Sequence, residues 1–437
     1  MYSYTKKFNR INNLQLNLDN IDENEASFFW ENNKSDELII GLGMCDEIEL
    51  FNSMDLELIQ SKITERLNNI KDLTPDLGMK PKFFGGYEFN IKNTTGKKWD
   101  NFPKGYFILP KYIIMSNQYS TFITLISQTN KSHITSIDTI YKKIIDNTTQ
   151  IKKRKKHINM NIINEPDSKS NYLKIINNIL SDIKKGIVDK VVLSKLKTIT
   201  IDRKFSISNA IRHLRIDYPE CINFYIHLPN RGIFLGSTPE RLIKKNDDKI
   251  ISEAIAGTIK RGLNSDEDFK LENKLRTDLK NLEEHNLVIK EITNLLSPIL
   301  NNIIISESPQ ILKLKNVQHL ITNIIGKLKN NIHIIDLVNM IHPTPAVSGY
   351  PVETANHLIN QYETHHRGWY SGPIGWIDSL GNGDFCVGLR SSYIKNKTIQ
   401  LFSGGGIVLN SIPEEEWIET ELKMKPILEI IENNGNK

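Results

Sequence analysis

In the second half of the chain, segments whose apolar residues recur at helical spacing alternate with segments of strand-like composition. This alternation constrains the fold more than any other feature. Apolar residues recur every three or four positions over residues 172–183, which predicts an amphipathic helix that ends at Gly186. The β-branched run 189–201 then predicts a strand. Further strands are predicted for FYIHLP, GIFLGSTPE and KIISEAIAGT, and further helices for residues 283–296 and 332–340. Strands in groups, with helices inserted between the groups, predict an α+β fold with large mixed sheets.

Shorter strand-like runs flank this region on both sides. In the first third, ELIIGLGM is an apolar run closed by glycines, and KFFGGYEFN contains Gly85 and Gly86, for which we expect a bulge or a tight turn. Pro110 limits GYFILPKYIIM to an edge strand or a break. Near the C-terminus, GPIGWID, DFCVGLRSSYI and TIQLFSGGGIV predict three strands before a closing helix that starts after Ser411.

The composition is that of a globular protein without a strong overall charge. The chain has 437 residues, 39% of them hydrophobic, and a net charge of +5. No strong electrostatic field therefore indicates a nucleic acid or a membrane as the partner. The three cysteines lack CxxC spacing, the N-terminus lacks the apolar segment of a signal peptide, and no apolar run has membrane-spanning length. We therefore expect a cytoplasmic protein. The basic run 152–157 is interpreted as a solvated helix end or linker, and the lack of GxGxxG and Walker A motifs indicates no nucleotide cofactor.

Lys190 and Glu240 are candidates for an acid–base pair. Lys190 starts the strand after Gly186, and it is either an exposed strand-end lysine or a base whose pKa burial has lowered. Glu240 ends the GSTPE turn, where it is either solvated or directed into a pocket as a general acid. A lysine and a glutamate with opposed roles require different environments, because each must be tuned toward the protonation state that it uses.

Acidic residues on two predicted helices are candidate metal ligands. Glu283 and Glu284 open one helix, and Glu416, Glu419 and Lys423 fall on one face of the last helix. The simple explanation is stabilisation of the helix dipoles and a Glu419–Lys423 surface pair. The alternative is that the two helices bring carboxylates together around a hard divalent cation, for which all-oxygen ligation suits Mg²⁺.

Arg390 and a glycine run are candidates for binding an anion. Arg390 lies in the predicted apolar strand CVGLRSSYI, and a buried arginine needs an anionic partner, because its planar guanidinium fits a carboxylate bidentately. Gly404, Gly405 and Gly406 end the next strand, where they form a turn or let backbone N–H groups approach an anionic ligand. With Lys423 and the clustered acids, these residues suit a small polycarboxylate held partly through a metal.

Ten segments, taken in order, resemble the chorismate-utilising enzyme family, which includes isochorismate, salicylate, anthranilate and aminodeoxychorismate synthases. The segments are DKVVLSK, GSTPE, AIAGT, EEHNLV, VQHL, HPTPAVSGYP, RGWYSGPIGW, GDFCVGLRSSYI, LFSGGGIV and PEEEWIETELK. They span residues 170–430, and FGGYEFN with the WxxFP motif at 99–103 resembles the weaker N-terminal half of the family. The resemblance implies one compact α+β unit, with an N-terminal half (1–150) and a catalytic chorismate-binding region (170–435). It also implies two extensive sheets packed as a sandwich, with helices outside.

The resemblance implies a role for each candidate residue. Lys190 matches the lysine that activates water for attack at C2 of chorismate, and Glu240 matches the acid that assists departure of the C4 hydroxyl. Glu284 and Glu419 match the Mg²⁺ ligands, with Glu416 near enough to act through water. The positions that match the chorismate site are Gly257, Ala346, Arg390, Gly404 and Lys423, with Thr258 and His342 in the family's loops around it.

Within the family, the sequence favours isochorismate formation. Ammonia-using relatives generally lack the lysine at position 190 and read SGT where this chain has AGT, and the HPTPAVSGYP loop differs from that of salicylate synthases. A salicylate synthase, which also expels pyruvate, is the alternative enzyme. A non-catalytic protein that binds a metabolite or a nucleic acid is disfavoured, because binding alone needs neither Lys190 nor Glu240.

Partners and the outer metal shell are less constrained by the sequence. We expect a monomer with no obligatory glutamine amidotransferase partner, whose product feeds menaquinone or siderophore synthesis. RGWYSGPIGW and DFCVGLRS resemble the menaquinone-branch enzymes more closely. Asn281 stands one turn before Glu284, where several relatives have an acid, and this substitution leaves the outer metal shell open.

Overall fold

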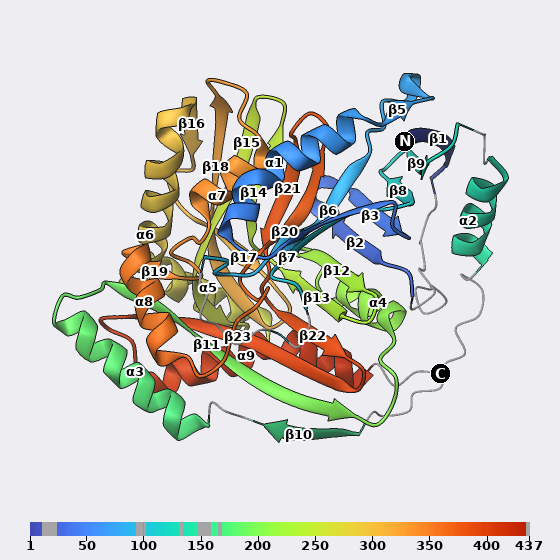
Figure 1. Cartoon of the computed structure of the whole chain (residues 1–437). Coiled ribbons are helices and arrows are strands. Elements are labelled where there is room, and N and C mark those ends of the chain that lie inside the picture. The colour runs from blue at the N-terminus through green and yellow to red at the C-terminus, as the bar shows by residue number, and fades with distance from the viewer. Residues whose placement is uncertain are drawn as a thin grey trace.

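Two large sheets form the body of the computed structural model, which describes residues 1–10, 24–92, 99, 102–130, 134–146, 159–164 and 168–433 (Figure 1). The strands of the first sheet are, in spatial order, β10 (Met160–Asn164), β11 (Lys190–Ile201), β23 (Thr398–Val408), β22 (Ser391–Lys395), β13 (Gly232–Thr238), β12 (Ile222–Leu228), β2 (Ser27–Asn32), β3 (Glu37–Leu42), β8 (Tyr112–Ser116), β9 (Ser120–Ser127), β1 (Tyr2–Asn9) and β5 (Lys71–Asp72), with β19 (Gly349–Tyr350) paired to β11. The strands of the second sheet are β16 (Leu300–Ile305), β18 (Val317–Leu328), β15 (Lys249–Lys260), β14 (Arg241–Asn246), β21 (Gly383–Val387), β20 (Pro373–Asp378), β6 (Lys82–Tyr87), β7 (Gly105–Leu109) and β4 (Asp46–Leu50), with β17 (Gln310–Lys313) paired to β18. Neighbouring strands are antiparallel except β1 and β5.

Helices cover the outer faces and edges of these sheets (Figure 1). They are α1 (Ser53–Asn68), α2 (Ile134–Asp146), α3 (Lys169–Lys184), α4 (Ile207–Asp217), α5 (Ser265–Thr277), α6 (Leu279–Leu296), α7 (Ile334–Ile341), α8 (Val352–Tyr362) and α9 (Pro413–Asn433). Helices α3 and α9 contact each other and β23, whereas α6 lies along β15. None of the helices in the described part of the chain has the length and apolar character needed to cross a lipid bilayer.

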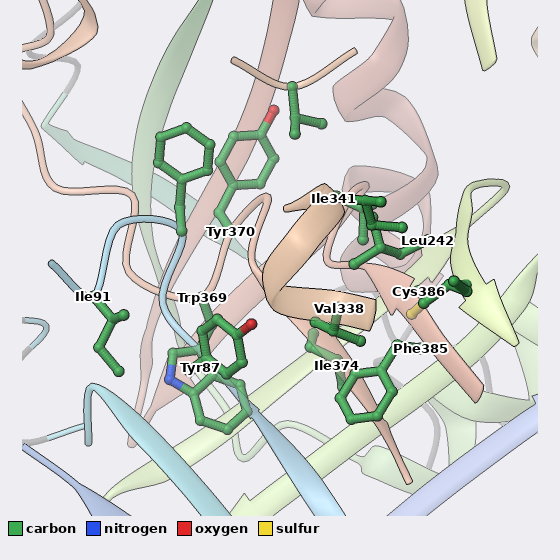
Figure 2. Close-up of a cluster of buried hydrophobic side chains, with 14 of the residues drawn as sticks. Tyr87, Ile91, Leu242, Val338, Ile341, Trp369, Tyr370, Ile374, Phe385 and Cys386 are labelled. Carbon is green, nitrogen blue, oxygen red and sulfur yellow. The ribbon is translucent and has the colours of Figure 1, made fainter. Parts of the chain in front are cut away.

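The hydrophobic core begins between the sheets and continues under the helices. Phe28 of β2 and Phe84 of β6 have ring centroids 4.5 Å apart, so the two layers touch directly. The same buried cluster extends beneath α7, where Val338 and Ile341 lie near Phe385 of β21 (Figure 2). A second cluster fills the other face of the first sheet under α4 and α9. The predicted α+β sandwich is therefore confirmed.

The two halves of the sequence are not separate in space, because both sheets take strands from each side of residue 150. The proposed boundary between 1–150 and 170–435 stays a prediction. The basic run 152–157 lies outside the described residues.

The chain crosses from one sheet to the other at two places that matter for function. Residues 239–240 connect β13 of the first sheet to β14 of the second, and residues 388–390 connect β21 of the second to β22 of the first. The predicted single strand CVGLRSSYI is therefore wrong: it breaks before Arg390, whose φ of 46° cannot continue a strand. The crossings are hydrogen-bonded to each other, from Val387 N–H to Glu240 C=O at 3.1 Å and from Ser237 N–H to Arg390 C=O at 3.2 Å.

Two further local predictions are corrected. Gly85 and Gly86 form no bulge or turn but lie in β6, between β7 and β20. A Cβ on Gly85 would come within 1.9 Å of the Tyr106 carbonyl oxygen, so these glycines permit close approach of neighbouring strands. Helix α6 begins at Leu279 with Asp278 as its N-cap, which moves Glu284 from the first turn to the second.

Candidate active site

A cavity opens between the sheets, beside the two crossings. The empty space that it and its open mouth contain is about 690 Å³. The predicted site residues that line it are Glu240, Gly257, Thr258, Glu284, Ala346, Arg390, Gly404 and Lys423. They come from both sheets, both crossings and two helices, so only the complete fold brings them together.

Lys190 forms a buried ion pair at the edge of this cavity. Its side chain is fully buried, and its Nζ lies 2.9 Å from Oε1 of Glu284. A Cβ on Gly406 would lie 2.4 Å from that carboxylate oxygen and 2.9 Å from Cε of Lys190. The glycine run is therefore part of strand β23, not a turn, and it provides the space in which the ion pair is held.

The Glu240 carboxyl group is 3% exposed and faces the same cavity. Burial raises its pKa, the nearby charges of Lys190 and Lys423 oppose that change, and Glu253 adds to it, which gives a pKa of about 8. The pKa of Glu284 changes in the opposite direction: burial raises it, but the charge and hydrogen bond of Lys190, together with the charges of Lys423 and Lys280, outweigh burial and lower it below its usual value. Glu240 thus keeps its proton at neutral pH while Glu284 is ionised, as an acid–base site requires.

Three carboxylates meet lysines where α6 and α9 approach β23. Besides the pair formed by Glu284, Glu416 lies 2.7 Å from Lys280 and Glu419 lies 2.7 Å from Lys423. Burial lowers the pKa of Lys280, but attraction from Glu416, Glu419 and Glu284 outweighs it and raises that pKa. All three acids thus act electrostatically on one lysine.

This all-oxygen set fits a hard divalent cation. Within the described residues no three His, Cys, Asp or Glu side chains already surround one point. Mg²⁺ needs only one or two protein carboxylates, because waters and substrate oxygens complete its shell. Glu284 and Glu419 are the two carboxylates that the sequence analysis assigns to such an ion, and each is paired with a lysine in this structure.

Arg390 is a buried cation without an acidic partner. Its side chain is 6% exposed, and no carboxylate in the described part of the chain forms an ion pair with it. Its guanidinium instead donates to Nε2 of His319 at 2.5 Å. Lys423 donates to the carbonyl oxygen of Gly404 at 3.2 Å, so a second cation lines the same cavity. This combination suits an anionic ligand.

His319 connects Arg390 to Thr258 and is a site residue that the sequence reasoning did not identify. Burial, together with the charge of Arg390, lowers its pKa far below the usual value, so the ring is neutral. Because Nε2 accepts from Arg390, Nδ1 bears the proton and donates to Oγ1 of Thr258 at 3.1 Å. Tyr370 and Ser371 also line the cavity and were not singled out. The only signals for these residues were the VQHL and RGWYSGPIGW segments.

The backbone on two sides of the cavity adopts a left-handed conformation. Gly257 has φ of 78° at a bulge in β15, and Asn281 holds that bulge by accepting the N–H of Thr258 at 3.0 Å. Ser371 and Arg390 also have positive φ. The other non-glycine residues of this kind in the described ranges are Asn or Asp in turns: Asp36, Asn230, Asp247 and Asn396. Asn and Asp tolerate this conformation, so the two costly cases are both at the cavity.

Two predicted residues lie elsewhere. His342 does not line the cavity; its Nε2 lies 3.1 Å from the carbonyl oxygen of Phe89, and its ring meets Tyr87 and Phe89 edge-on. Glu419 does not line the cavity either, but it pairs with Lys423, which does.

The geometry defines an enzyme site for a small anionic substrate, with a proton donor at the centre, and comparisons with known proteins agree. A family model described as chorismate binding enzyme matches residues 1–432. The chain is 32% identical over 411 residues to isochorismate synthase MenF of Bacillus subtilis, a match that covers 92% of this chain and 87% of that protein. This protein is a member of the chorismate-binding enzyme family.

Solved structures show the same fold. MenF, the menaquinone-specific isochorismate synthase from Escherichia coli, has a TM-score of 0.78 at 24% identity and covers 98% of this chain and 94% of its own. Anthranilate synthase component I from Streptococcus pneumoniae has a TM-score of 0.70 at 16% identity and covers 97% of this chain and 91% of its own. Enzymes with different names thus share this fold, so the reaction must be argued from the site.

Proposed function

We propose that the protein is an isochorismate synthase, which exchanges the C4 hydroxyl of chorismate for a hydroxyl at C2. The observation that carries the proposal is Glu240, a buried carboxyl group with a pKa of about 8, in the same cavity as Arg390, a buried cation for which the described residues provide no acidic partner. An enzyme with this function needs a proton donor beside a carboxylate-binding group. The name of the Bacillus subtilis relative supports the same reaction.

In the proposed reaction, Lys190 and Glu240 transfer the protons. Water bonds to C2 as its proton passes to the neutral amine of Lys190. The C4–O bond breaks as Glu240 gives its proton to the leaving hydroxyl, which departs as water. Lys190 is held by Glu284 in this structure, so it acts as a base only after its ammonium has lost a proton.

The metal in this proposal is Mg²⁺, with Glu284 and Glu419 as its ligands and Glu416 acting through water. When bound, the ion supplies positive charge that holds the ring carboxylate of chorismate. Asn281, in place of an acid, contributes to the site by holding the Gly257–Thr258 bulge.

Chorismate binding is assigned to the cations and the small residues of the cavity. Arg390 and Lys423 would neutralise its carboxylates, while Gly257, Thr258, Ala346 and Gly404 give its ring close access to the backbone. His342 would act indirectly, through the Phe89 segment that it contacts.

Product analysis tests the proposal. Purified protein incubated with chorismate and Mg²⁺ should form isochorismate, convert isochorismate back and stop at a mixture, because one ring alcohol is exchanged for another. Stoichiometric pyruvate would move the assignment to a salicylate synthase. An aminated ring formed with ammonia would indicate an anthranilate-type enzyme, and no product would indicate a binding protein.

The physiological setting that we propose is menaquinone synthesis. Two relatives are named MenF, and the MenF of Escherichia coli is described as menaquinone-specific. We propose a cytoplasmic monomer that needs no glutamine amidotransferase. Gel filtration of the active protein and growth of a deletion strain with added menaquinone would test these points.

A further inference from the structure

Strands β14 and β15 separate as they approach the cavity, and hydrogen bonds from side chains replace the backbone hydrogen bonds between the two strands. Their backbone pairing is confined to the end near their connecting turn. Beyond it, Ser252 donates its hydroxyl hydrogen to the carbonyl oxygen of Leu242 at 2.7 Å. Oε2 of Glu253 accepts the backbone N–H of Arg241 at 3.3 Å. The Glu253 carboxylate thus accepts a backbone N–H of β14 that would otherwise bond to a backbone carbonyl oxygen of the neighbouring strand.

Glu253 also belongs to a buried ionic group that joins three adjacent strands. Its Oε1 accepts from Nη1 of Arg241 at 3.1 Å, while Nε and Nη2 of Arg241 donate to the two oxygens of Asp384 at 3.0 and 3.3 Å. The side chains of Glu253, Arg241 and Asp384 are 6%, 8% and 0% exposed. Strands β15, β14 and β21 are therefore fixed to one another at the residue that follows Glu240.

We propose that Glu253 is a positioning residue for Glu240: by holding both the backbone and the guanidinium of Arg241, it fixes the direction in which the Glu240 carboxyl enters the cavity. The same peptide group is held a second time, because the Glu240 carbonyl oxygen accepts the N–H of Val387, and on the other side the Glu240 N–H donates to Oγ1 of Thr238 at 3.2 Å. The inference rests on the proposed function only in calling Glu240 the proton donor. The positioning of Glu240 by Glu253 is argued from contacts alone and holds for any reaction in this cavity.

The charge of Glu253 has a second effect on the same carboxyl group. A neighbouring negative charge favours the protonated form of Glu240, and Glu253 is the acid that acts on it in this way. The other charged or titratable groups that face Glu240 from the surrounding elements are Lys190 of β11, Lys423 of α9, Cys386 of β21 and Arg390 of the crossing. The three cations favour ionisation, so Glu253 offsets part of their effect.

Two variants separate the two effects. Glu253→Gln keeps an oxygen for the Arg241 N–H but removes the charge, so the alkaline limb of the kcat profile should fall by about 1 pH unit. Glu253→Ala also removes the acceptor, and its kcat at the pH optimum should fall about tenfold or more. The KM for chorismate should change little in both, because Arg390 and Lys423 are untouched.

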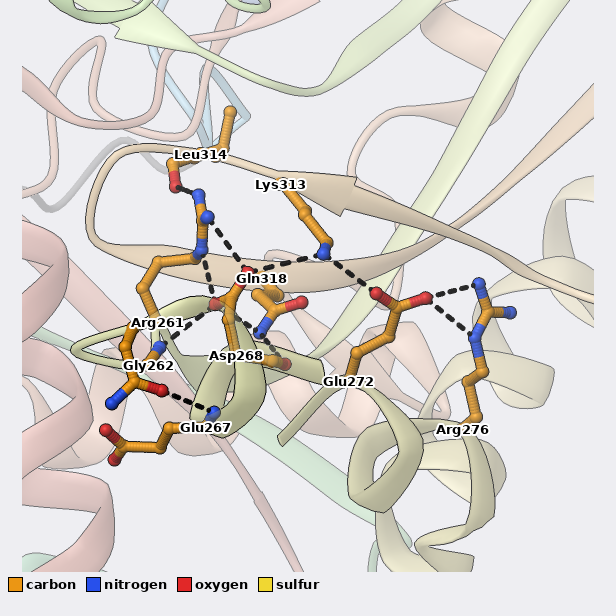
Figure 3. A network of polar contacts seen from close by, with 10 residues as sticks. Arg261, Gly262, Glu267, Asp268, Glu272, Arg276, Lys313, Leu314 and Gln318 are labelled. Atoms are coloured by element: carbon orange, nitrogen blue, oxygen red, sulfur yellow. Dashed lines mark hydrogen bonds and ion pairs between the residues drawn. The ribbon is translucent and has the colours of Figure 1, made fainter. Parts of the chain in front are cut away.

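Asp268 provides the matched control (Figure 3). It too holds a guanidinium and a backbone N–H, since Oδ1 accepts from Nε of Arg261 at 2.7 Å and from the N–H of Gly262 at 2.9 Å. It does not act on Glu240. Asp268→Asn should therefore lower the melting temperature without moving the alkaline limb.

A result in which both Glu253 variants lose stability but keep the wild-type kcat and the wild-type alkaline limb would show that Glu253 is merely structural, and it would overturn the proposal. If Glu253→Ala does not fold, Glu253→Gln alone decides.

Infrared spectroscopy without substrate gives an independent readout. The protonated carboxyl band that disappears in Glu240→Gln should titrate at lower pH in Glu253→Gln. That shift in a protein that leaves chorismate unchanged would refute the proposed function and retain this inference.

Discussion

Nζ of Lys190 lies 2.9 Å from Oε1 of Glu284, which joins the proposed base to a proposed metal ligand in one buried ion pair. Each residue neutralises the other in a region from which water is largely excluded. Removal of one charge therefore affects both the chemistry and the stability of the fold, and these two effects can be measured separately.

Lys190→Ala is expected to lower turnover roughly 10²-fold or more, because Lys190 is the proposed acceptor of the proton of water. It should also lower the free energy of unfolding by about 3 kcal/mol, because Glu284 loses its ion-pair partner in a buried site. Steady-state kinetics and urea unfolding measure the two losses. The double variant Lys190→Met/Glu284→Gln should recover stability but not activity. Near-normal turnover in Lys190→Ala would place the base elsewhere.

Glu240→Gln should lower turnover by about 10²-fold or more and remove the alkaline limb of the pH–rate profile. The pKa of Glu240 is raised from 4.5 to about 8, so its contribution to stability is complete below pH 4.5 and is lost as the pH rises to about 8. Denaturant unfolding at several pH values should therefore show a wild-type stability that declines over this range relative to Glu240→Gln. A constant difference would mean that Glu240 is ionised at neutral pH.

Glu284→Gln and Glu419→Gln should each abolish activity in a protein that still folds, although Glu284→Gln should also lose stability, because Lys190 is left without its ion-pair partner. The expected cause is loss of Mg²⁺ binding, because each variant removes one of two direct carboxylate ligands. Titration calorimetry with Mg²⁺ measures this without turnover. Glu415→Gln is the matched control, since Glu415 lies exposed in the first turn of α9, one turn before Glu419. Wild-type Mg²⁺ affinity in the first two variants would refute the site.

Arg390→Lys should raise the KM for chorismate by about 10-fold or more, because an ammonium group cannot bind a carboxylate bidentately. Turnover at saturation should change less. Arg276→Lys, at an exposed pair with Glu272, should leave KM unchanged. An unchanged KM in Arg390→Lys would show that the substrate carboxylate binds elsewhere.

Regular elements with strong local patterns could be predicted from the sequence. The helix predicted over 172–183 is α3, and the strand predicted over 189–201 is β11, because the spacing of apolar residues alone determines which side is buried. The break at Arg390 could not be predicted in this way. CVGLRSSYI has the composition of one strand, and only pairing with different sheets divides it.

Residues of the candidate site could be predicted where a charged side chain lies in an apolar segment of the sequence. Lys190, Glu240 and Arg390 are charged residues in apolar surroundings, and the structure buries all three. His319 has no such signal, because its function depends on contacts with Thr258 and Arg390, which lie 61 and 71 residues away in sequence. A single histidine in a strand gives no indication of either contact.

The left-handed backbone at Arg390 has a consequence for how this protein can be improved. A non-glycine residue held in this conformation costs roughly 1 kcal/mol or more, and glycine or asparagine would relieve most of it. Screens that reward heat resistance alone should therefore select replacements at positions 371 and 390, and would remove substrate recognition as they succeed. Thermostable versions of this enzyme should be sought at positions away from the cavity, because changes there leave the proposed substrate-binding cation in place.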